Sequence, residues 1–260
     1  MNSFQHKKSL GQNFLVNLRR AEEIIKIANI KETDVVLEVG PGEGALTNLI
    51  AKSKAKKIIL IEKDERLIEN LKFQFADDAR FLIINDDALK IDYRGLAGDD
   101  KIKIIANLPY YIATELLFCW LDNIESFSAL YLMFQKEVAE RIVATNNNKE
   151  FGRLSILVQI LCRVEIVLDL LPQDFNPPPK VSSSVIQILP YPNISLSGEQ
   201  KKNISKFSEV IFSQRRKMLS TILKKHPIYL EKLLKLGIDL QLRPENLSIE
   251  DIKRIILNYP

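Results

Sequence analysis

Histidine and cysteine are scarce in this chain of 260 residues, which has two of each. His6 and His226 lie far apart in the sequence, and Cys119 and Cys162 stand singly in apolar, helix-like surroundings. A Cys/His zinc cluster and a Ser-His-Asp triad both need more of these residues, so neither a metal site nor that kind of hydrolytic chemistry is expected. The two cysteines are predicted to be small core residues, not a disulfide or a ligand pair.

Apolar runs are short as well. The longest, such as Leu154–Leu161, are soon followed by charge and fall below the roughly 20 residues that a membrane helix needs. The N-terminus is polar and a recognisable motif starts at Ser9, which argues against a secretory signal or transit peptide. An apolar fraction of 46% and a charged fraction of 27% are ordinary for a soluble globular protein. We therefore expect a cytoplasmic protein without a membrane partner.

Positive charge is unevenly distributed along the chain, whose net charge is +4. Residues 199–227 carry eight lysines and arginines and two glutamates, a local charge of +6, so the rest of the chain is −2. Residues 1–20 add a second basic stretch with Lys7, Lys8, Arg19 and Arg20 and no acid. A solvated helix face usually explains one basic run, but two runs on either side of an acidic middle favour a polyanionic partner.

Short strand-like apolar runs, the first of them β-branched, alternate with helical apolar spacing through the first two thirds of the chain. The expected strands are 35–39, 57–61, 79–84, 102–106 and 129–134, and the expected helices are 18–30, 45–52, 65–75 and 114–120. This alternation is typical of right-handed crossovers in a doubly wound, Rossmann-like α/β sheet. Runs 164–170 and 184–189 have no helix between them and predict an antiparallel hairpin at one edge.

A connector rich in proline, serine and glycine spans Pro190–Gly198. The apolar spacing after it is helical throughout. We therefore predict two domains, an α/β domain over residues 1–192 and a small all-helical domain over residues 193–260.

A glycine-rich loop joins the first expected strand of the sheet to the next helix. Gly40, Gly42 and Gly44 let the backbone turn tightly and approach a nucleotide-like ligand closely. A dinucleotide fingerprint needs its third glycine three residues after the second, whereas here the interval is two. This G-x-G-x-G form is the one that accommodates S-adenosylmethionine, although taken alone it is also compatible with a structural turn.

Acidic residues end the next two expected strands. Glu62 stands about twenty residues after the glycine loop, where a carboxylate accepts the two ribose hydroxyls of a nucleotide. Asp86 and Asp87 end the following strand, where one carboxylate can accept the adenine amino group. Acids at strand ends are common, but three suitable features at successive strand ends, on the crevice side of the sheet, favour a cofactor site.

The fourth expected strand ends in the sequence Asn-Leu-Pro-Tyr, residues Asn107, Leu108, Pro109 and Tyr110. The N6 amine of adenine is a poor nucleophile that must be aimed at the methyl donor rather than strongly deprotonated. The Asn107 side-chain oxygen and the Leu108 carbonyl can each accept an N6–H bond, and Pro109 fixes the backbone between them. Tyr110 offers its ring to an extruded base. The ring and not the hydroxyl is used, so Tyr110→Phe is expected to leave activity nearly unchanged. A plain Asn-x-Pro turn is the alternative interpretation.

Five motifs together resemble the KsgA/RsmA family of small-subunit ribosomal RNA adenine N6,N6-dimethyltransferases. They begin at Ser9, Gly40, Asn107, Phe175 and Phe212, and the resemblance runs from about Lys7 to the C-terminus. It implies that S-adenosylmethionine is the methyl donor and that two adjacent adenosines in the terminal hairpin of 16S rRNA, in the immature small ribosomal subunit, are the substrate. It also implies a set of cofactor contacts: Asn13, Leu15, Gly40, Gly42, Glu62, Asp87 and Asn107. A monomer is expected.

Phe175 and the basic run 215–217 can each be interpreted in two ways. Phe175 precedes three consecutive prolines and is predicted either to stack on the far side of the target base or to be a core aromatic. Arg215, Arg216 and Lys217 are expected in a helix, either facing the phosphates of an RNA groove or forming a solvated face. The family pattern usually has one acid where Asp86 and Asp87 stand, and Asp87 is preferred because Ala88 follows it.

Three rival functions share part of this pattern. An Erm-type enzyme uses the same chemistry on large-subunit rRNA, but Leu108, where isoleucine is expected in that group, and the stretch Phe175–Val185 favour the small subunit. A noncatalytic relative, such as a mitochondrial transcription factor, would not need an intact cofactor loop with Glu62 and Asn107. A DNA adenine methyltransferase usually has Asp/Asn-Pro-Pro-Tyr/Phe and a target-recognition domain larger than residues 193–260.

Overall fold

The computed structural model describes residues 13–192 and 196–257. The chain forms two compact units. One contains the described residues up to Ala139 together with Glu165–Pro190, and the other contains Glu140–Val164 and the described residues from Tyr191 onward. Within the described ranges, no helix is both long enough and apolar enough to span a membrane.

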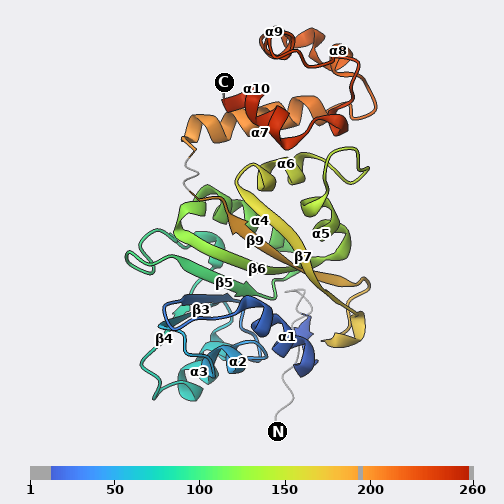
Figure 1. Cartoon of the computed structure of the whole chain (residues 1–260). Helices are drawn as coiled ribbons and strands as arrows, with labels where there is room; N and C mark the ends of the chain where they lie inside the picture. The colour runs from blue at the N-terminus through green and yellow to red at the C-terminus, as the bar shows by residue number, and fades with distance from the viewer. Residues whose placement is uncertain (1–12, 193–195, 258–260) are drawn as a thin grey trace. The chain divides into compact units, whose positions relative to one another are not determined.

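The first unit is built on a seven-stranded sheet with the order β4-β3-β2-β5-β6-β9-β7 (Figure 1). The five strands from β4 to β6 are parallel, and β9 runs antiparallel to β6. The predicted α/β sheet with an antiparallel edge is thus confirmed. The strands are β2 Val35–Val39, β3 Lys57–Glu62, β4 Phe81–Asn85, β5 Ile102–Ala106, β6 Phe127–Gln135, β7 Cys162–Leu170 and β9 Ser183–Pro190.

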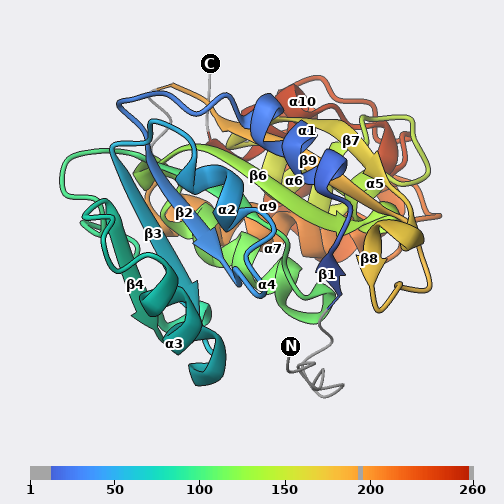
Figure 2. The same cartoon turned by 90° about the horizontal axis from the view of Figure 1, so that it is seen from below.

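Helices cover both faces of the sheet. Buried residues of α1 (Leu18–Ala28), α2 (Thr47–Ala51) and α3 (Glu65–Gln74) join one core cluster with alternate residues of the strands. Figure 2 shows α4 (Tyr110–Asp122) behind the sheet, on the face away from α1 and α2. This helix begins four residues before the predicted start because Pro109, with φ −57°, is its N-cap and presets the chain for a helical turn.

A second, two-stranded sheet joins segments far apart in the sequence. β1 (Phe14–Leu15) pairs antiparallel with β8 (Phe175–Asn176), with Leu15 opposite Phe175. The buried Asp174 reinforces this pairing: its side chain accepts a 2.7 Å hydrogen bond from the Asn17 amide, and its carbonyl accepts one of 2.8 Å from the Val16 N–H. Neither strand is predictable from the sequence, because two residues are too few to show the alternation of a strand.

The second unit is helical. Its core includes Ile204, Phe207, Ile211, Leu233 and Leu247, all of them buried. The helical segments in or entering this unit are α5 Lys136–Val143, α6 Arg153–Gln159, α7 Gly198–Phe212, α8 Leu219–Ile222, η5 Leu223–Lys225, α9 Pro227–Lys235, η6 Pro244–Asn246 and α10 Ile249–Leu257.

The basic run 215–217 is not helical, contrary to the prediction. α7 ends at Phe212, and the following residues form turns. Beyond them the chain is held by hydrogen bonds from the Leu219 N–H to the Leu242 carbonyl and from the Ser220 N–H to the Leu240 carbonyl, 2.8 and 2.9 Å. The three basic residues therefore lie in the connection between α7 and α8 and do not occupy successive positions of one helix.

Candidate cofactor and catalytic site

A cavity lies at the carboxyl ends of the central strands of the first unit. Three segments line it, residues 13–15, the glycine loop after β2 and residues 107–109, together with the acids Glu38 and Glu62. β2 has β3 on one side and β5 on the other, so the connections diverge here. Open α/β sheets bind ligands in the crevice at such a switch point. Residues 9–12 of the motif that begins at Ser9 lie outside the described residues.

The glycines of the loop serve two different purposes. Gly40 has φ +68°, and a Cβ built on it would meet no atom within 4 Å, so the backbone there is open to a ligand. Gly42 has φ +57°, and its Cβ would approach the Phe14 ring to 2.7 Å. Gly42 therefore allows the N-terminal segment to pack on the loop, a reason that the sequence alone did not reveal.

Glu62 is fixed at the end of β3 by main-chain donors. Its Oε1 accepts hydrogen bonds from the N–H groups of Lys63 and Asp64, at 2.8 and 2.9 Å. Its Oε2 accepts a longer one of 3.4 Å from the Gly42 N–H. Burial raises the pKa of this carboxyl, and the main-chain donors oppose that rise. The orientation of the carboxyl group is thus fixed by the main chain, and Oε2 keeps more hydrogen-bonding capacity for a ligand than Oε1 does.

Glu38 lies on β2 beside Glu62 and is also buried, with 1% exposure. Burial raises the pKa of Glu38 to about 8, and the nearby Glu62 adds to the rise. The Thr47 hydroxyl, which donates a 2.7 Å hydrogen bond to Oε2, works in the opposite direction. The two carboxyl groups form no ion pair with any described residue.

We expect Glu38 to make the folded chain less stable as the pH rises from about 5 to about 8. Its folded pKa lies above its ordinary value of 4.5, so the folded state holds a proton that the unfolded state releases in this window. That contribution to stability is complete below pH 4.5 and is lost as the pH rises through 8. Glu38→Gln should reduce the pH dependence of the free energy of unfolding by up to about 1.4 kcal/mol per pH unit.

Urea unfolding midpoints of the ligand-free protein at pH 5, 7 and 9 would measure this effect. Glu43→Gln, an exposed change in the same loop, is the matched control and should keep the wild-type dependence. Parallel curves for the Glu38→Gln and wild-type chains would contradict the expectation.

S-adenosylmethionine fits this cavity chemically. Its sulfonium and ammonium groups are cationic, and a cation beside the two buried carboxyl groups would favour their ionised forms, for which no described residue supplies a cationic partner. Glu62 supplies acceptors for ribose hydroxyls, and the open backbone at Gly40 leaves room beside them. Bound there, the cofactor supplies an electrophilic methyl group.

Asp87 is held by Lys63, the residue that follows Glu62. Its Oδ2 accepts a 2.8 Å hydrogen bond from the Lys63 Nζ, and its Oδ1 caps the 3₁₀ turn η2 (Ala88–Lys90) through the Leu89 N–H. The Lys63 ammonium lowers the pKa of Asp87. Asp86 accepts the Asp87 N–H. Neither aspartate lines the cavity, so the predicted adenine contact of Asp87 stays a prediction.

Asn107, Leu108 and Pro109 line the cavity from the end of β5. The Asn107 Nδ2 donates a 3.0 Å hydrogen bond to the Asn13 carbonyl, which orients the side chain and leaves its Oδ1 as an acceptor. Tyr110 follows as the first residue of α4, and its hydroxyl is hydrogen-bonded to the Ser183 Oγ at 2.6 Å. Burial raises the pKa of Tyr110, so the phenol is neutral at physiological pH.

Residues 3–259 match the family model described as ribosomal RNA adenine dimethylase. The chain belongs to this family. It is 44% identical to the ribosomal RNA small subunit methyltransferase A of Pelagibacter ubique, over 97% of this chain and 96% of that protein. It is 43% identical to the protein of the same name from Ehrlichia chaffeensis, over 96% and 95%.

Solved structures agree with the fold of this dimethylase. A dimethyladenosine transferase from Plasmodium falciparum superposes with a TM-score of 0.83 at 29% identity, over 94% of this chain and 96% of that one. The 23S rRNA methyltransferase ErmE superposes with a TM-score of 0.73 over 94% and 98%, but at 21% identity, so this likeness concerns the fold alone. The chain is thus an rRNA adenine dimethyltransferase that uses S-adenosylmethionine.

Phe175 of the dimethylase is buried, with 3% exposure, in the core cluster that also holds Leu15. The structure therefore places it as a core aromatic, one of the two interpretations that the sequence left open. Stacking on a base would require the ring to leave this packing, so that role stays a prediction. The following Asn176–Pro177 peptide bond is cis.

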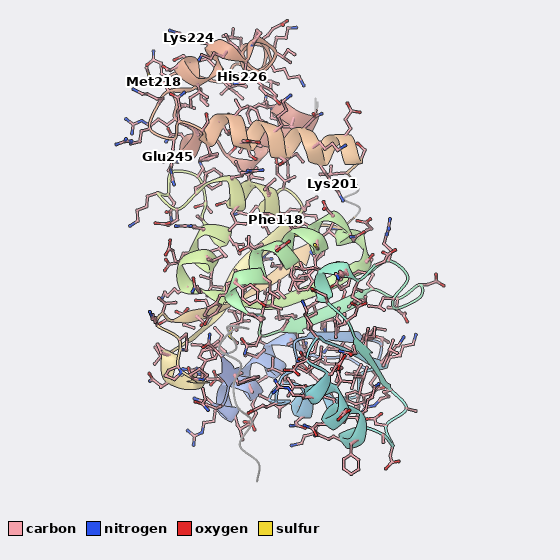
Figure 3. The ribbon with its side chains drawn as sticks, turned by 180° about the vertical axis from the view of Figure 1, so that it is seen from behind. Phe118, Lys201, Met218, Lys224, His226 and Glu245 are labelled. Atoms are coloured by element: carbon pink, nitrogen blue, oxygen red, sulfur yellow. The ribbon has the colours of Figure 1, made fainter. Side chains whose placement is uncertain are left out.

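The predicted RNA-contacting side chains differ in their surroundings. Arg215 Nε forms a 3.0 Å ion pair with Glu245, and its NH2 donates to the Lys149 carbonyl, so this guanidinium has partners inside the second unit. Arg216 and Lys217 are exposed. Figure 3 shows Lys201 toward one end of α7, with Met218 and Glu245 near the other.

A hollow in the same unit gathers further positive charge. Lys206 from α7, Lys225 and His226 from the turn before α9, and Lys232 from α9 line it. No described residue of its lining is acidic. The sequence placed Lys206 and Lys225 in the same basic stretch, and the fold brings them to one surface although 19 positions separate them.

Proposed function

We propose that this chain transfers methyl groups from S-adenosylmethionine to the N6 amines of two adjacent adenosines in the 3′-terminal hairpin of 16S rRNA. The product is N6,N6-dimethyladenosine, and the substrate is the immature small ribosomal subunit. The observation that carries the proposal is the meeting of Asn107, Leu108 and Pro109 with two buried carboxyl groups in one cavity. The names of the bacterial relatives, which specify the small subunit, support the choice of RNA.

The residues act mainly by orienting the amine. The Asn107 Oδ1 and the Leu108 carbonyl accept the two N6–H groups, which localises the nitrogen lone pair and directs it toward the methyl carbon. The bond from Asn107 to the Asn13 carbonyl fixes the side chain before the substrate arrives. Tyr110 stacks on the extruded base, and such a contact contributes about 1–3 kcal/mol per base.

Transfer of tritiated methyl groups tests the substrate. Undermethylated small subunits, large subunits and DNA are offered in parallel, and label is expected in the small subunit alone. Label confined to the large subunit would replace the proposal by an Erm-type activity, and label in DNA would point to a DNA adenine methyltransferase. No transfer to any of the three by a chain that binds the cofactor would favour a noncatalytic relative.

We further propose that the domain over residues 193–260 contacts the ribosomal RNA and that the chain acts as a monomer. The exposed Arg216 and Lys217 and the acid-free hollow around Lys206 support the RNA contact by charge complementarity. Arg215 is part of the proposed RNA-binding set. Its ion pair with Glu245 also links the turn after α7 to η6.

Neutralising Arg216 and Lys217 together is expected to flatten the salt dependence of RNA binding by about 1.4–1.8 units of log–log slope, since each phosphate contact contributes roughly 0.7–0.9. Cofactor affinity should not change. Filter binding to undermethylated small subunits between 50 and 300 mM salt, about the range over which phosphate contacts are resolved, measures the slope. Lys235→Gln, which removes an exposed lysine paired with Glu231, is the control. An unaltered slope would show that Arg216 and Lys217 belong to a solvated surface and do not contact RNA phosphates.

A further inference from the structure

The hydroxyl of Tyr110 has a buried partner outside its own helix. Ser183 Oγ lies 2.6 Å from it, and Ser183 has no solvent exposure. Tyr110 itself is half-buried and follows directly on the Asn107–Pro109 segment that lines the cavity. The contact therefore links the first residue of α4 to the first residue of β9, 73 positions later.

Ser183 is held firmly by the sheet. It pairs with Gln135 at the end of β6, and the Lys136 N–H donates a 2.9 Å hydrogen bond to the Ser182 carbonyl beside it. The next residue, Ser184, donates a 2.6 Å hydrogen bond to Asp169 of β7. The position of the Ser183 Oγ is thus set by main-chain pairing that does not depend on α4.

A tyrosine ring that is attached only through its Cβ can still swing and tilt about χ1 and χ2. A hydrogen bond at the far end of the ring fixes a second point on the ring axis, so the direction in which the ring projects is defined before any base arrives. Phenylalanine at the same place would keep the stacking surface and lose this second point. The expectation that Tyr110→Phe is nearly silent did not allow for such a partner.

We propose that Ser183 is a positioning residue, which acts through Tyr110 to fix the place of the ring on which the target adenine stacks. The proposal rests on the proposed stacking function of Tyr110. Misalignment of the stacked base lowers the rate of methyl transfer, because the amine is no longer aimed along the line of displacement. RNA affinity changes little, because phosphate contacts elsewhere supply most of it.

The test is a double-mutant cycle with Ser183→Ala and Tyr110→Phe, read as kcat and KM for undermethylated small subunits at saturating cofactor. Each single change is expected to lower kcat by about 3- to 10-fold, the range of one net hydrogen bond, with KM within about twofold. The double variant should be no slower than the slower single variant. Ser184→Ala, which removes a hydroxyl bond of the same length to Asp169, is the matched control and should retain the wild-type kcat.

Multiplying effects in the double variant would show that the two residues act independently and would overturn the proposal, as would a wild-type kcat in Ser183→Ala. A fall in kcat of equal size in Ser184→Ala would show that the effect comes from a destabilised β9 and not from Tyr110, and would also overturn the proposal. If Ser183→Ala does not fold, Tyr110→Phe probes the same bond from the other side, and full activity there would also overturn the proposal. Failure of the proposed function is separate, because the wild-type chain would then label no small subunit.

Discussion

Replacement of Asn107 by alanine is expected to lower the single-turnover rate of methyl transfer by about 100-fold or more, because an acceptor that aims the amine is removed. The rate is measured at saturating cofactor, since the Asn107 amide also donates to the Asn13 carbonyl in the cavity wall. Loss of that bond is expected to lower the affinity for the cofactor. A saturating cofactor concentration keeps this effect out of the measured rate.

The control for this change is Asn85→Ala. Asn85 also ends a strand of the sheet and also makes one side-chain bond to a main-chain carbonyl, that of Glu62, at 3.0 Å. It lies outside the cavity lining, so its variant should transfer methyl groups at nearly the wild-type rate. An Asn107→Ala chain that stays within about threefold of the wild-type rate, well short of the loss typical of a removed acceptor, would take Asn107 out of the chemistry.

Glu62→Gln is expected to raise the dissociation constant for S-adenosylmethionine about 10- to 100-fold, since a hydrogen bond to a charged acceptor contributes about 1.5–3 kcal/mol. The glutamine oxygen can still accept from the Lys63 and Asp64 N–H groups, while its amide nitrogen cannot accept a ribose hydroxyl. Alanine would be less informative, because it would also leave those two donors without their acceptor.

Calorimetric titration of the cofactor into the folded variant measures the change, and circular dichroism verifies that the fold is retained. Glu69→Gln, an exposed change on α3, serves as the control and should bind like the wild-type chain. An unchanged affinity in Glu62→Gln would mean that the carboxylate does not contact the cofactor.

The parallel part of the fold was predictable because its strands are short, mostly apolar runs bounded by polar residues. β2 and β5 match their predicted limits, and Glu62 and Asn107 fall at strand ends because the runs before them end there. The cavity follows from this arrangement, since parallel strands bring their carboxyl ends to one edge. Cys162 is fully buried as expected, whereas Cys119 on α4 keeps partial exposure.

Long-range pairings were not predictable, because no local pattern encodes them. The contact of Tyr110 with Ser183, the ion pair of Arg215 with Glu245 and the short strand at Phe14 each join positions far apart in the sequence. A charge run shows how many basic side chains are available, but not which of them find an acid within the fold. The same limit applies to Phe175, whose type fits a base platform and a core equally well.

The wall of the cavity over residues 13–15 comes from outside the seven-stranded sheet. Its attachments include the two-residue pairing with β8, the packing of Phe14 on Gly42, the burial of Leu15 in the core cluster and the hydrogen bond from Asn107 to the Asn13 carbonyl. A two-residue strand has fewer main-chain hydrogen bonds than the central strands, so we expect this segment to open at a lower free-energy cost than they do. We therefore expect the cavity to become accessible through local opening at residues 13–15, without unfolding of the seven-stranded sheet.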